Sequence, residues 1–354
     1  MLITNILSFL FIITILVVIH ELGHFLAAKS IGLRVEKFYV GFNLFGLGLK
    51  KKINDTEFGI GLFPIGGYVK VAGMVDESLD DQYQGEDDEY ISKSMLQKVW
   101  FTSGGVIFNF ILAFLLFTSI IYIDGTPTNI VNEPILDKVY NGEPAALIGL
   151  KSGDIITKIN NQDISSWDEL ADHIHSNPNK QILLTWDRNN LIMSDSILVK
   201  EMITVDGDTL GVIGISPIIE KEMVGFFSSI KHGFNETVGW LVLMSYTILY
   251  FFIGQLGIEN FGGPIAIASI AGDAAQNGII DLIRLMAILS VNLGIINILP
   301  FPGLDGGHAL IAIIEGIIGR RIPFKTLMII QQIGILLLII FFFIIMKNDI
   351  SRLL

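Results

Sequence analysis

The chain has 354 residues, of which 51% are hydrophobic, and its formal net charge is -12. Its mean hydropathy of +0.62 is typical of a polytopic membrane protein with room for a soluble domain, and excludes an ordinary globular enzyme. The negative charge argues against a nucleic-acid partner. The absence of cysteine excludes disulfides and thiolate ligands, so any metal site must use His, Asp or Glu.

The first apolar run, Leu2–Ala28, ends in the motif His-Glu-Leu-Gly-His and carries no charged side chain before His20. Its length is that of a membrane-spanning helix. In a helix, His20 and His24 lie about one turn apart on the same face. Glu21 beside them is placed to activate water at a bound metal. Because ionisable groups are costly in a bilayer, this motif predicts a zinc site inside the membrane.

The next segment, Lys29–Lys98, is polar, but it contains a stretch rich in glycine and β-forming residues, Phe58–Met74. A turn signal at residues 64–67 predicts a β-hairpin there, and its apolar character suggests that it dips toward the membrane. Backbone at that depth needs hydrogen bonds from protein or from a water-filled cavity. The alternative is a cytosolic hairpin. The acidic run Asp76–Glu89 predicts a solvated loop.

A polar stretch of about a hundred residues, the size of a small domain, follows the second apolar run, Val99–Ile123. The part Gly142–Asn160 predicts a small-residue helix start, a Gly-Asp turn and the strand Ile155–Ile159. An amphipathic helix is expected over Trp167–Ile174. This order is similar to that of a PDZ domain, a fold that binds an extended peptide at a sheet edge.

Three further apolar runs are Val238–Ile258, Leu285–Leu299 and Leu327–Met346. Basic residues cluster at 50–52, 93, 98, 320, 321 and 325, and the positive-inside rule places them on the cytoplasmic face. The PDZ-like region then lies outside, in the periplasm of a bacterium. If Val238–Ile258 crossed the membrane, Asp305 and the arginines would face the wrong side. We therefore predict four spanning helices, with Val238–Ile258 against the outer leaflet or paired with a re-entrant return through Gly262–Ala275.

Two histidines leave zinc short of a third protein ligand. The best candidate is Asp305, which follows two prolines, Pro300 and Pro302, in a glycine-rich stretch that breaks the apolar helix. A carboxylate in that position is costly unless it is paired or coordinates a metal. By chemistry alone, His308 is an alternative ligand.

Together, these features resemble the site-2 protease family of intramembrane zinc metalloproteases (M50 type), in particular its bacterial RseP-like branch, which cleaves anti-sigma factors. The features are the HELGH motif, Asn297 eight residues before Asp305, the apolar glycine-rich segment and an inserted PDZ domain. Gly262-Gly263-Pro264 is similar to a Gly-Pro signature of the family. The chain departs from the family where Val106 stands in place of a proline, three residues before Asn109.

The resemblance implies roles for particular residues. His20, His24 and Asp305 would hold Zn²⁺, and Glu21 would act as general base and later as acid. Asn297 would hold the substrate strand or the reacting carbonyl. The re-entrant segment, with Gly66, Gly67 and Tyr68, would present the unwound substrate. Asn109 is open between packing and support of the site.

The expected fold is a polytopic α-helical membrane protein with about four spanning helices, a membrane re-entrant β-hairpin and an inserted periplasmic α+β PDZ domain. The expected parts are residues 1–124, with the HExxH helix, the β-loop and the second spanning helix; 125–218, the PDZ domain; 219–281, a membrane-associated periplasmic-side segment; and 282–354, the C-terminal membrane part.

The expected function is intramembrane cleavage of single-span membrane proteins, of the anti-sigma-factor or signal-peptide-remnant type. The expected location is the bacterial inner membrane, with the active site in its cytoplasmic half and the PDZ domain free to contact peptide or substrate domains. Two alternatives are a non-proteolytic PDZ scaffold and a metal transporter. The intact His-Glu-His-Asp set argues against the scaffold, and Glu21 with the PDZ insertion argues against the transporter.

Overall fold

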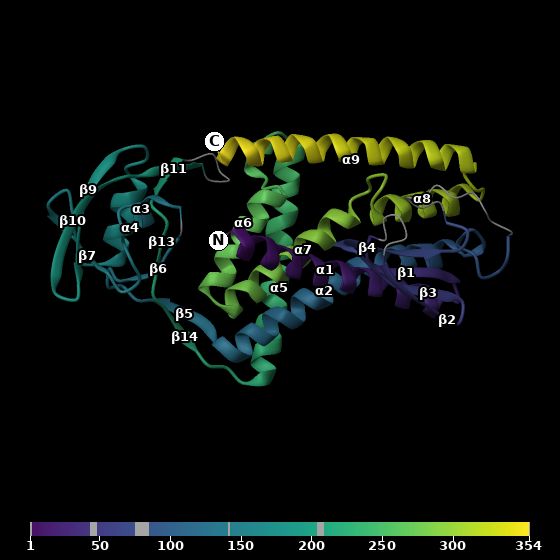
Figure 1. The fold of residues 1–354 in the computed structure, drawn as a ribbon, viewed down its shortest axis with the longest axis horizontal. Coiled ribbons are helices and arrows are strands. Elements are labelled where there is room, and N and C mark those ends of the chain that lie inside the picture. Colours follow the sequence, from purple (N-terminus) through teal and green to yellow (C-terminus); the bar gives the residue numbers. More distant parts are fainter. Residues whose placement is uncertain (1, 43–47, 75–84, 141, 204–208, 354) are drawn as a thin grey trace. The chain divides into compact units, whose positions relative to one another are not determined.

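The computed structural model describes residues 2–42, 48–74, 85–140, 142–203 and 209–353. These residues form two compact units (Figure 1). Unit 1 comprises residues 1–120 and 226–354, and unit 2 is the intervening segment Ile121–Gly225. Part of the predicted acidic loop Asp76–Glu89, residues 76–84, lies outside the described residues.

Unit 1 is mainly helical. Its helices are α1 (Leu2–Ser30), α2 (Met95–Asp124), α5 (Phe226–Phe252), α6 (Pro264–Asn277), α7 (Ile279–Ile298), α8 (Asp305–Ile318) and α9 (Phe324–Leu353), with short 3₁₀ turns at Tyr90–Ser92 and Ile258–Asn260. Within the described ranges, four helices are long and apolar enough to cross a membrane: α1, α2, α7 and α9. That number agrees with the predicted four. Helix α5 is not among them, because polar residues such as Asn235 and Glu236 lower the hydropathy of its first half.

Helices α1 and α2 cross in direct backbone contact. A Cβ added to Gly23 would lie 2.3 Å from the Gly104 carbonyl oxygen, and one added to Gly104 would lie 2.6 Å from the Gly23 oxygen. Only glycine at both positions permits this approach, as in closely packed membrane helices. Apolar side chains of α1, α6 and α7, including Ile12, Leu16 and Met286, form a buried cluster.

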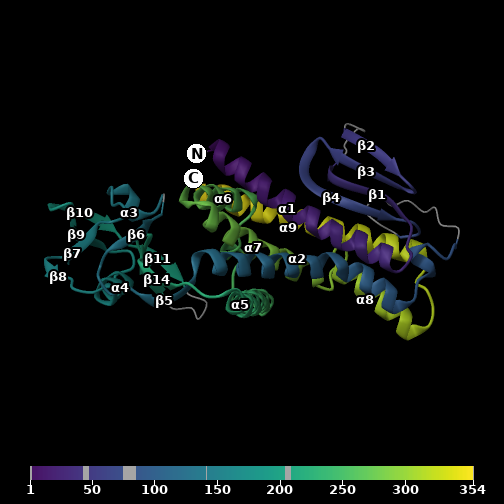
Figure 2. The ribbon, with the colours of Figure 1, turned by 90° about the horizontal axis from the view of Figure 1, so that it is seen from below.

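A four-stranded sheet completes unit 1 and lies along the C-terminal half of α1 (Figure 2). Its strands are β1 (Val35–Phe42), β2 (Gly48–Ile53), β3 (Thr56–Gly61) and β4 (Phe63–Val71), in the order β2-β3-β1-β4. Strand β1 is parallel to β3 and antiparallel to β4. The two edges of the sheet are therefore β2 and β4, with β4 packed against α1.

The predicted β-hairpin over Phe58–Met74 is wrong in its pairing. The two strands in that segment, β3 and β4, lie on opposite sides of β1 and do not pair with each other. The chain turns at Leu62, and Phe63 then pairs with Phe42 at the end of β1. The expected turn residues 64–67 lie within β4 instead. Glycine and proline indicated a turn locally, but pairing with a distant strand decided the conformation.

Unit 2 is an α+β unit. Its elements in chain order are β5 (Thr126–Ile130), β6 (Leu136–Val139), α3 (Pro144–Leu147), β7 (Ile155–Ile159), β8 (Gln162–Asp163), α4 (Trp167–His175), β9 (Gln181–Arg188), β10 (Leu191–Leu198), β11 (Lys200–Ile203), β12 (Thr209–Val212), β13 (Ile215–Pro217) and β14 (Ile219–Glu222). The predicted strand Ile155–Ile159 and the predicted helix at Trp167 are confirmed. Strands β10-β9-β7-β8 form one sheet, and β5 pairs with β14 where the chain enters and leaves the unit.

The core of unit 2 explains why α4 forms where it does. Trp167, Leu170 and Ile174 recur at helical spacing and are buried against the sheet, together with Trp186 and Leu184 of β9. The side chain of Ser166 caps the helix by accepting a hydrogen bond from the Glu169 amide, a contact worth about 1 kcal/mol at an N-cap.

Candidate active site

The two histidines of the first apolar run lie on one buried face of α1. His20 and His24 are 8% and 7% exposed, and their Nε2 atoms are 3.2 Å apart. Both face α2 at its closest approach to α1. A Cβ added to Gly105 of α2 would lie 2.5 Å from His20 Cε1 and 2.5 Å from His24 Nε2. Because Gly105 has no side chain, the two imidazoles can occupy this space.

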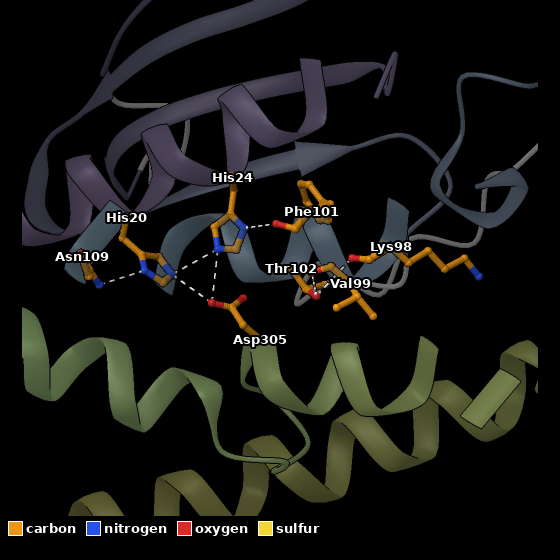
Figure 3. Close-up of polar contacts among 8 residues, drawn as sticks. All are labelled: His20, His24, Lys98, Val99, Phe101, Thr102, Asn109 and Asp305. Carbon is orange, nitrogen blue, oxygen red and sulfur yellow. Dashed lines mark hydrogen bonds and ion pairs between the residues drawn. The ribbon is translucent and has the colours of Figure 1, made fainter. Parts of the chain in front are cut away.

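The third side chain comes from the far end of the sequence. Helix α7 ends at Ile298, and the next helix, α8, begins at Asp305 after a break that contains Pro300, Pro302 and Gly303. Gly303 has a positive φ of 97°, which glycine adopts without strain. The break turns the chain so that the first residue of α8 faces α1. Asp305 Oδ2 lies 3.2 Å from His20 Nε2 and 3.3 Å from His24 Nε2 (Figure 3).

These three atoms fit the requirements of a zinc site. Zinc binds imidazole nitrogen and carboxylate oxygen at about 2.0–2.2 Å in a tetrahedron, whose ligand atoms are then about 3.3 Å apart. The three separations among the His20, His24 and Asp305 atoms are 3.2, 3.2 and 3.3 Å. Asp305 Oδ2 is also a buried oxygen that no hydrogen-bond donor satisfies among the described residues. A cation between the three atoms would satisfy it.

Hydrogen bonds from α2 orient both imidazoles. His24 Nδ1 lies 2.9 Å from the Phe101 carbonyl oxygen, so this nitrogen donates and Nε2 is left to bind a metal. His20 Nδ1 lies 3.1 Å from Asn109 Nδ2, and Asn109 Oδ1 has no hydrogen-bond partner among the described residues. The nitrogen and oxygen ends of an amide have nearly the same shape. With the amide turned so that Oδ1 faces His20, Oδ1 accepts a hydrogen bond from Nδ1, and Nε2 is left to bind a metal.

The Asn109 backbone is held in turn by α7, because its carbonyl oxygen accepts a hydrogen bond from Ser290 Oγ at 2.8 Å. The sequence left the role of Asn109 open, and the structure places its amide beside His20. The Phe101 contact could not be predicted from residue type, since it uses a backbone carbonyl. Its only signal in the sequence is the helical spacing of residues 101, 105 and 109 along one face of α2.

Glu21 lies next to the edge strand β4. It is half-buried, and a Cβ added to Gly67 of β4 would lie 3.3 Å from Glu21 Cγ and 2.7 Å from the Tyr39 carbonyl oxygen. Glycine at position 67 thus allows β4 to pack against α1 at the candidate base. Tyr68, the next residue, stacks in parallel on Tyr39 with ring centroids 5.2 Å apart.

Two contacts of Tyr39 position the sheet around it. Its ring covers Gly59, where a Cβ would lie 2.2 Å from the ring. Its hydroxyl donates a hydrogen bond of 2.6 Å to Glu57 Oε1, and this bond lowers the pKa of the Glu57 carboxyl. Tyr39 therefore ties β3 and β4 together through the strand between them.

The remaining candidates lie near the site but not in its ligand set. Asn297 is on the last turn of α7, half-buried, eight residues before Asp305. His308 is one turn after Asp305 on α8 and lines a cavity of about 270 Å³ together with Tyr90. Burial, with the negative charges of Glu315 and Asp305, raises the pKa of the Tyr90 hydroxyl. Among the described residues, the His, Asp and Glu side chains arranged to hold a metal are His20, His24 and Asp305.

The chain matches known proteins over most of its length. The model of peptidase family M50 matches residues 8–341. The regulator of sigma-W protease RasP from Bacillus subtilis is 27% identical and covers 100% of both chains. The zinc metalloprotease RasP from Geobacillus kaustophilus is 28% identical over 98% of both. A relative from Campylobacter jejuni is 32% identical over 97% of this chain and 92% of its own.

Solved structures similar to part of the chain include PDZ domains of SdrC-like proteins. The domain from Listeria innocua is 30% identical, with a TM-score of 0.21, and covers 24% of this chain and 93% of its own. The domain from Listeria monocytogenes is 24% identical, with a TM-score of 0.22, and covers 26% and 93%. From the family match, the relatives and the four apolar helices, the chain belongs to peptidase family M50 and is a membrane-embedded zinc metalloprotease of the site-2 type.

Proposed function

We propose that the enzyme cuts single-span membrane proteins within or near their transmembrane segments, in regulated intramembrane proteolysis of anti-sigma factors or in removal of signal-peptide remnants. The observation that carries this proposal is the convergence of His20, His24 and Asp305 from helices α1 and α8. The name of the B. subtilis relative, regulator of sigma-W protease RasP, supports this substrate class.

In this proposal His20, His24 and Asp305 hold zinc, and Phe101 and Asn109 hold the imidazoles. Bound zinc would polarise the scissile carbonyl and lower the pKa of water to about 7. Glu21 accepts the proton of the attacking water and then donates it to the leaving nitrogen. Its position beside His20 on α1 and beside Gly67 on β4 supports this role. Asn297, at the end of α7, donates hydrogen bonds from its side-chain amide to the reacting carbonyl or to the substrate strand.

Strand β4 is proposed to receive the unwound substrate. A helical substrate hides its carbonyl groups in its own hydrogen bonds, and a strand edge can replace those bonds. Strand β4 is an edge of the sheet, and its residues Gly66, Gly67 and Tyr68 run past Glu21. The opposite edge, β2, carries Lys50, Lys51 and Lys52, and lysines on an edge strand disfavour strand addition.

Unit 2 is proposed to be a PDZ domain on the periplasmic side of a bacterial inner membrane, with the active site in the cytoplasmic half. The succession of β6, α3, β7 and α4 supports the PDZ assignment, and the basic residues at the other side of the spanning helices support the orientation. The domain would contact substrates before their transmembrane segments reach the site.

Replacement of the base tests the reaction. The detergent-solubilised wild type and a Glu21→Gln variant are incubated with a model single-span substrate, and cleavage is followed by gel electrophoresis. Loss of a general base lowers the rate about 10²- to 10⁴-fold, and zinc content should stay at the wild-type level. The matched control is Glu220→Gln, which changes an exposed carboxylate in β14. Equal cleavage by wild type and Glu21→Gln would contradict the proposal.

Replacement of the distant carboxylate tests the ligand set separately. An Asp305→Asn variant should lose most of its bound zinc, measured by elemental analysis, because the neutral amide is a poor ligand. A His308→Asn variant should retain it, since His308 lines the neighbouring cavity. The reverse result, with zinc retained in Asp305→Asn and lost in His308→Asn, would make His308 the third ligand.

A further inference from the structure

A second cavity lies next to the one that His308 lines. It has a volume of about 190 Å³ and lies between the N-terminal end of α2, the C-terminal end of α8 and the turn that follows α8. We call it the basic cavity. Its charged lining residues are Lys93, Lys98, Glu315, Arg320 and Arg321, so four cations and one carboxylate face the same space.

The one acidic group in the basic cavity is already engaged. Glu315 Oε2 accepts a hydrogen bond of 2.8 Å from Lys98 Nζ, and both side chains are largely buried, at 12% and 8% exposure. Glu315 Oε1 accepts a second bond of 3.0 Å from the Ile322 amide. The carboxylate therefore neutralises Lys98 and is not available to the arginines. Lys93 donates to the Gly32 carbonyl oxygen at 2.9 Å, which holds its charge beside the cavity.

Arg320 and Arg321 are left without an acidic partner. Both are exposed, and within the part of the chain that the structure describes neither guanidinium forms an ion pair. Both arginines line the same cavity, and a guanidinium group matches the oxygens of a phosphate, to which it can donate two hydrogen bonds.

The location of the basic cavity specifies the source of the phosphate. Arg320 and Arg321 follow the end of α8 and lie a few residues before α9, which begins at Phe324 and is long and apolar enough to cross a membrane. In a membrane that α9 crosses, residues just before its first turn lie at the level of the lipid headgroups. The uncharged lining of the cavity includes Ile91, Met95 and Ala312, which suits the glycerol and upper acyl carbons of a lipid. Basic pockets between membrane helices bind anionic headgroups.

We propose that the basic cavity is a binding site for one anionic phospholipid, whose phosphate is held by Arg320, Arg321 and Lys93. The site is separate from the zinc ligands, so lipid would occupy it whether or not substrate is bound. It would anchor the turn between α8 and α9 at the headgroup level, and α8 carries Asp305.

The test is native mass spectrometry of the full-length protein released from detergent micelles, with phosphatidylglycerol or phosphatidylcholine added. We expect one phosphatidylglycerol molecule to be retained in preference to phosphatidylcholine. A double variant, Arg320→Gln with Arg321→Gln, should bind phosphatidylglycerol on the order of thirtyfold more weakly, from the usual contribution of each cation near a headgroup. The double variant Arg320→Lys with Arg321→Lys should keep most of the preference for phosphatidylglycerol.

The matched control is Lys51→Gln with Lys52→Gln, which removes two exposed cations of β2 that do not line the basic cavity. It should leave lipid retention unchanged. Zinc content is measured in every variant to establish that the fold is intact. Equal retention of the two lipids, or an unchanged preference in the glutamine variant, would overturn the proposal. Displacement of the lipid by inorganic phosphate at comparable concentration would assign the cavity to free phosphate instead.

Discussion

At the scale of single residues, the site depends on glycine at position 105, because any side chain there would collide with the imidazoles. Gly105 of α2 lies against both imidazoles, and the Phe101 carbonyl and Asn109 amide on the same face of α2 orient them. The histidines alone could adopt several rotamers. Contact with α2 selects the one in which both Nε2 atoms point toward Asp305.

This arrangement predicts that Gly105→Ala binds zinc more weakly than the wild type. An added Cβ would lie 2.5 Å from both rings, so at least one imidazole must move away from its ligand position. Loss of the contacts that orient metal-binding histidines typically lowers metal affinity about 10- to 100-fold, which competition with a zinc chelator measures. Gly239→Ala on α5 is the control, because nothing described lies within 4 Å of its added Cβ. Wild-type affinity in Gly105→Ala would contradict the argument.

At the scale of elements, the ends of distant helices hold each other. Asp349, near the end of α9, is 2% exposed and accepts hydrogen bonds from the amides of Gly263, Ile265 and Ala266 at the N-terminus of α6, at 2.8, 2.9 and 3.1 Å. A carboxylate in this position satisfies orphan N–H groups and complements the helix dipole. The segment at the Gly-Pro signature of α6 thus supplies the N–H donors that hold the last helix.

Removal of this carboxylate should destabilise the contact between α6 and α9. Asp349→Ala leaves three backbone N–H groups without their acceptor, and loss of such a cap costs about 0.5–2 kcal/mol. The expected result is a lower thermal midpoint of the protein in detergent, followed by tryptophan fluorescence. Lys347→Ala removes an exposed side chain two residues earlier and should leave the midpoint unchanged. The same midpoint in both variants would argue against the cap.

At the scale of the whole molecule, the proposed zinc ligands and unit 2 belong to separate compact units. Thr126 pairs with Glu222 and Ile130 with Ile219, so the chain enters and leaves unit 2 on two paired strands. His20, His24 and Asp305, together with Phe101 and Asn109, all lie in unit 1. Unit 2 is therefore an insertion whose two ends are neighbours.

A chain in which residues 127–221 are replaced by a short Gly-Ser linker should retain zinc at the wild-type level. Such a linker can join neighbouring ends at low entropic cost. It should also cleave a model substrate that consists of a transmembrane segment with short flanks. Zinc content and cleavage are measured side by side with the intact chain. If zinc were lost on deletion, unit 2 would be part of the metal site rather than an insertion.

The amino-acid sequence by itself determined the features that depend on local chemistry. Apolar runs specified α1, α2, α7 and α9, because burial of the backbone in a membrane demands helices. The spacing of His20 and His24 placed them on one helix face. Pro300 and Pro302 indicated that α7 ends before Asp305. The Gly-Asp turn and the amphipathic pattern of residues 167–174 located β7 and α4 in unit 2.

Tertiary structure alone decided the features that depend on partners far apart in the chain. The insertion of β1 between β3 and β4, where a hairpin was predicted, follows from pairing across the sheet and leaves no local signal. The Phe101 carbonyl beside His24 and the Asp349 carboxylate on α6 are separated from their partners by 77 and up to 86 residues. Such contacts form because buried polar groups must be satisfied, and which groups meet is set by how the helices pack.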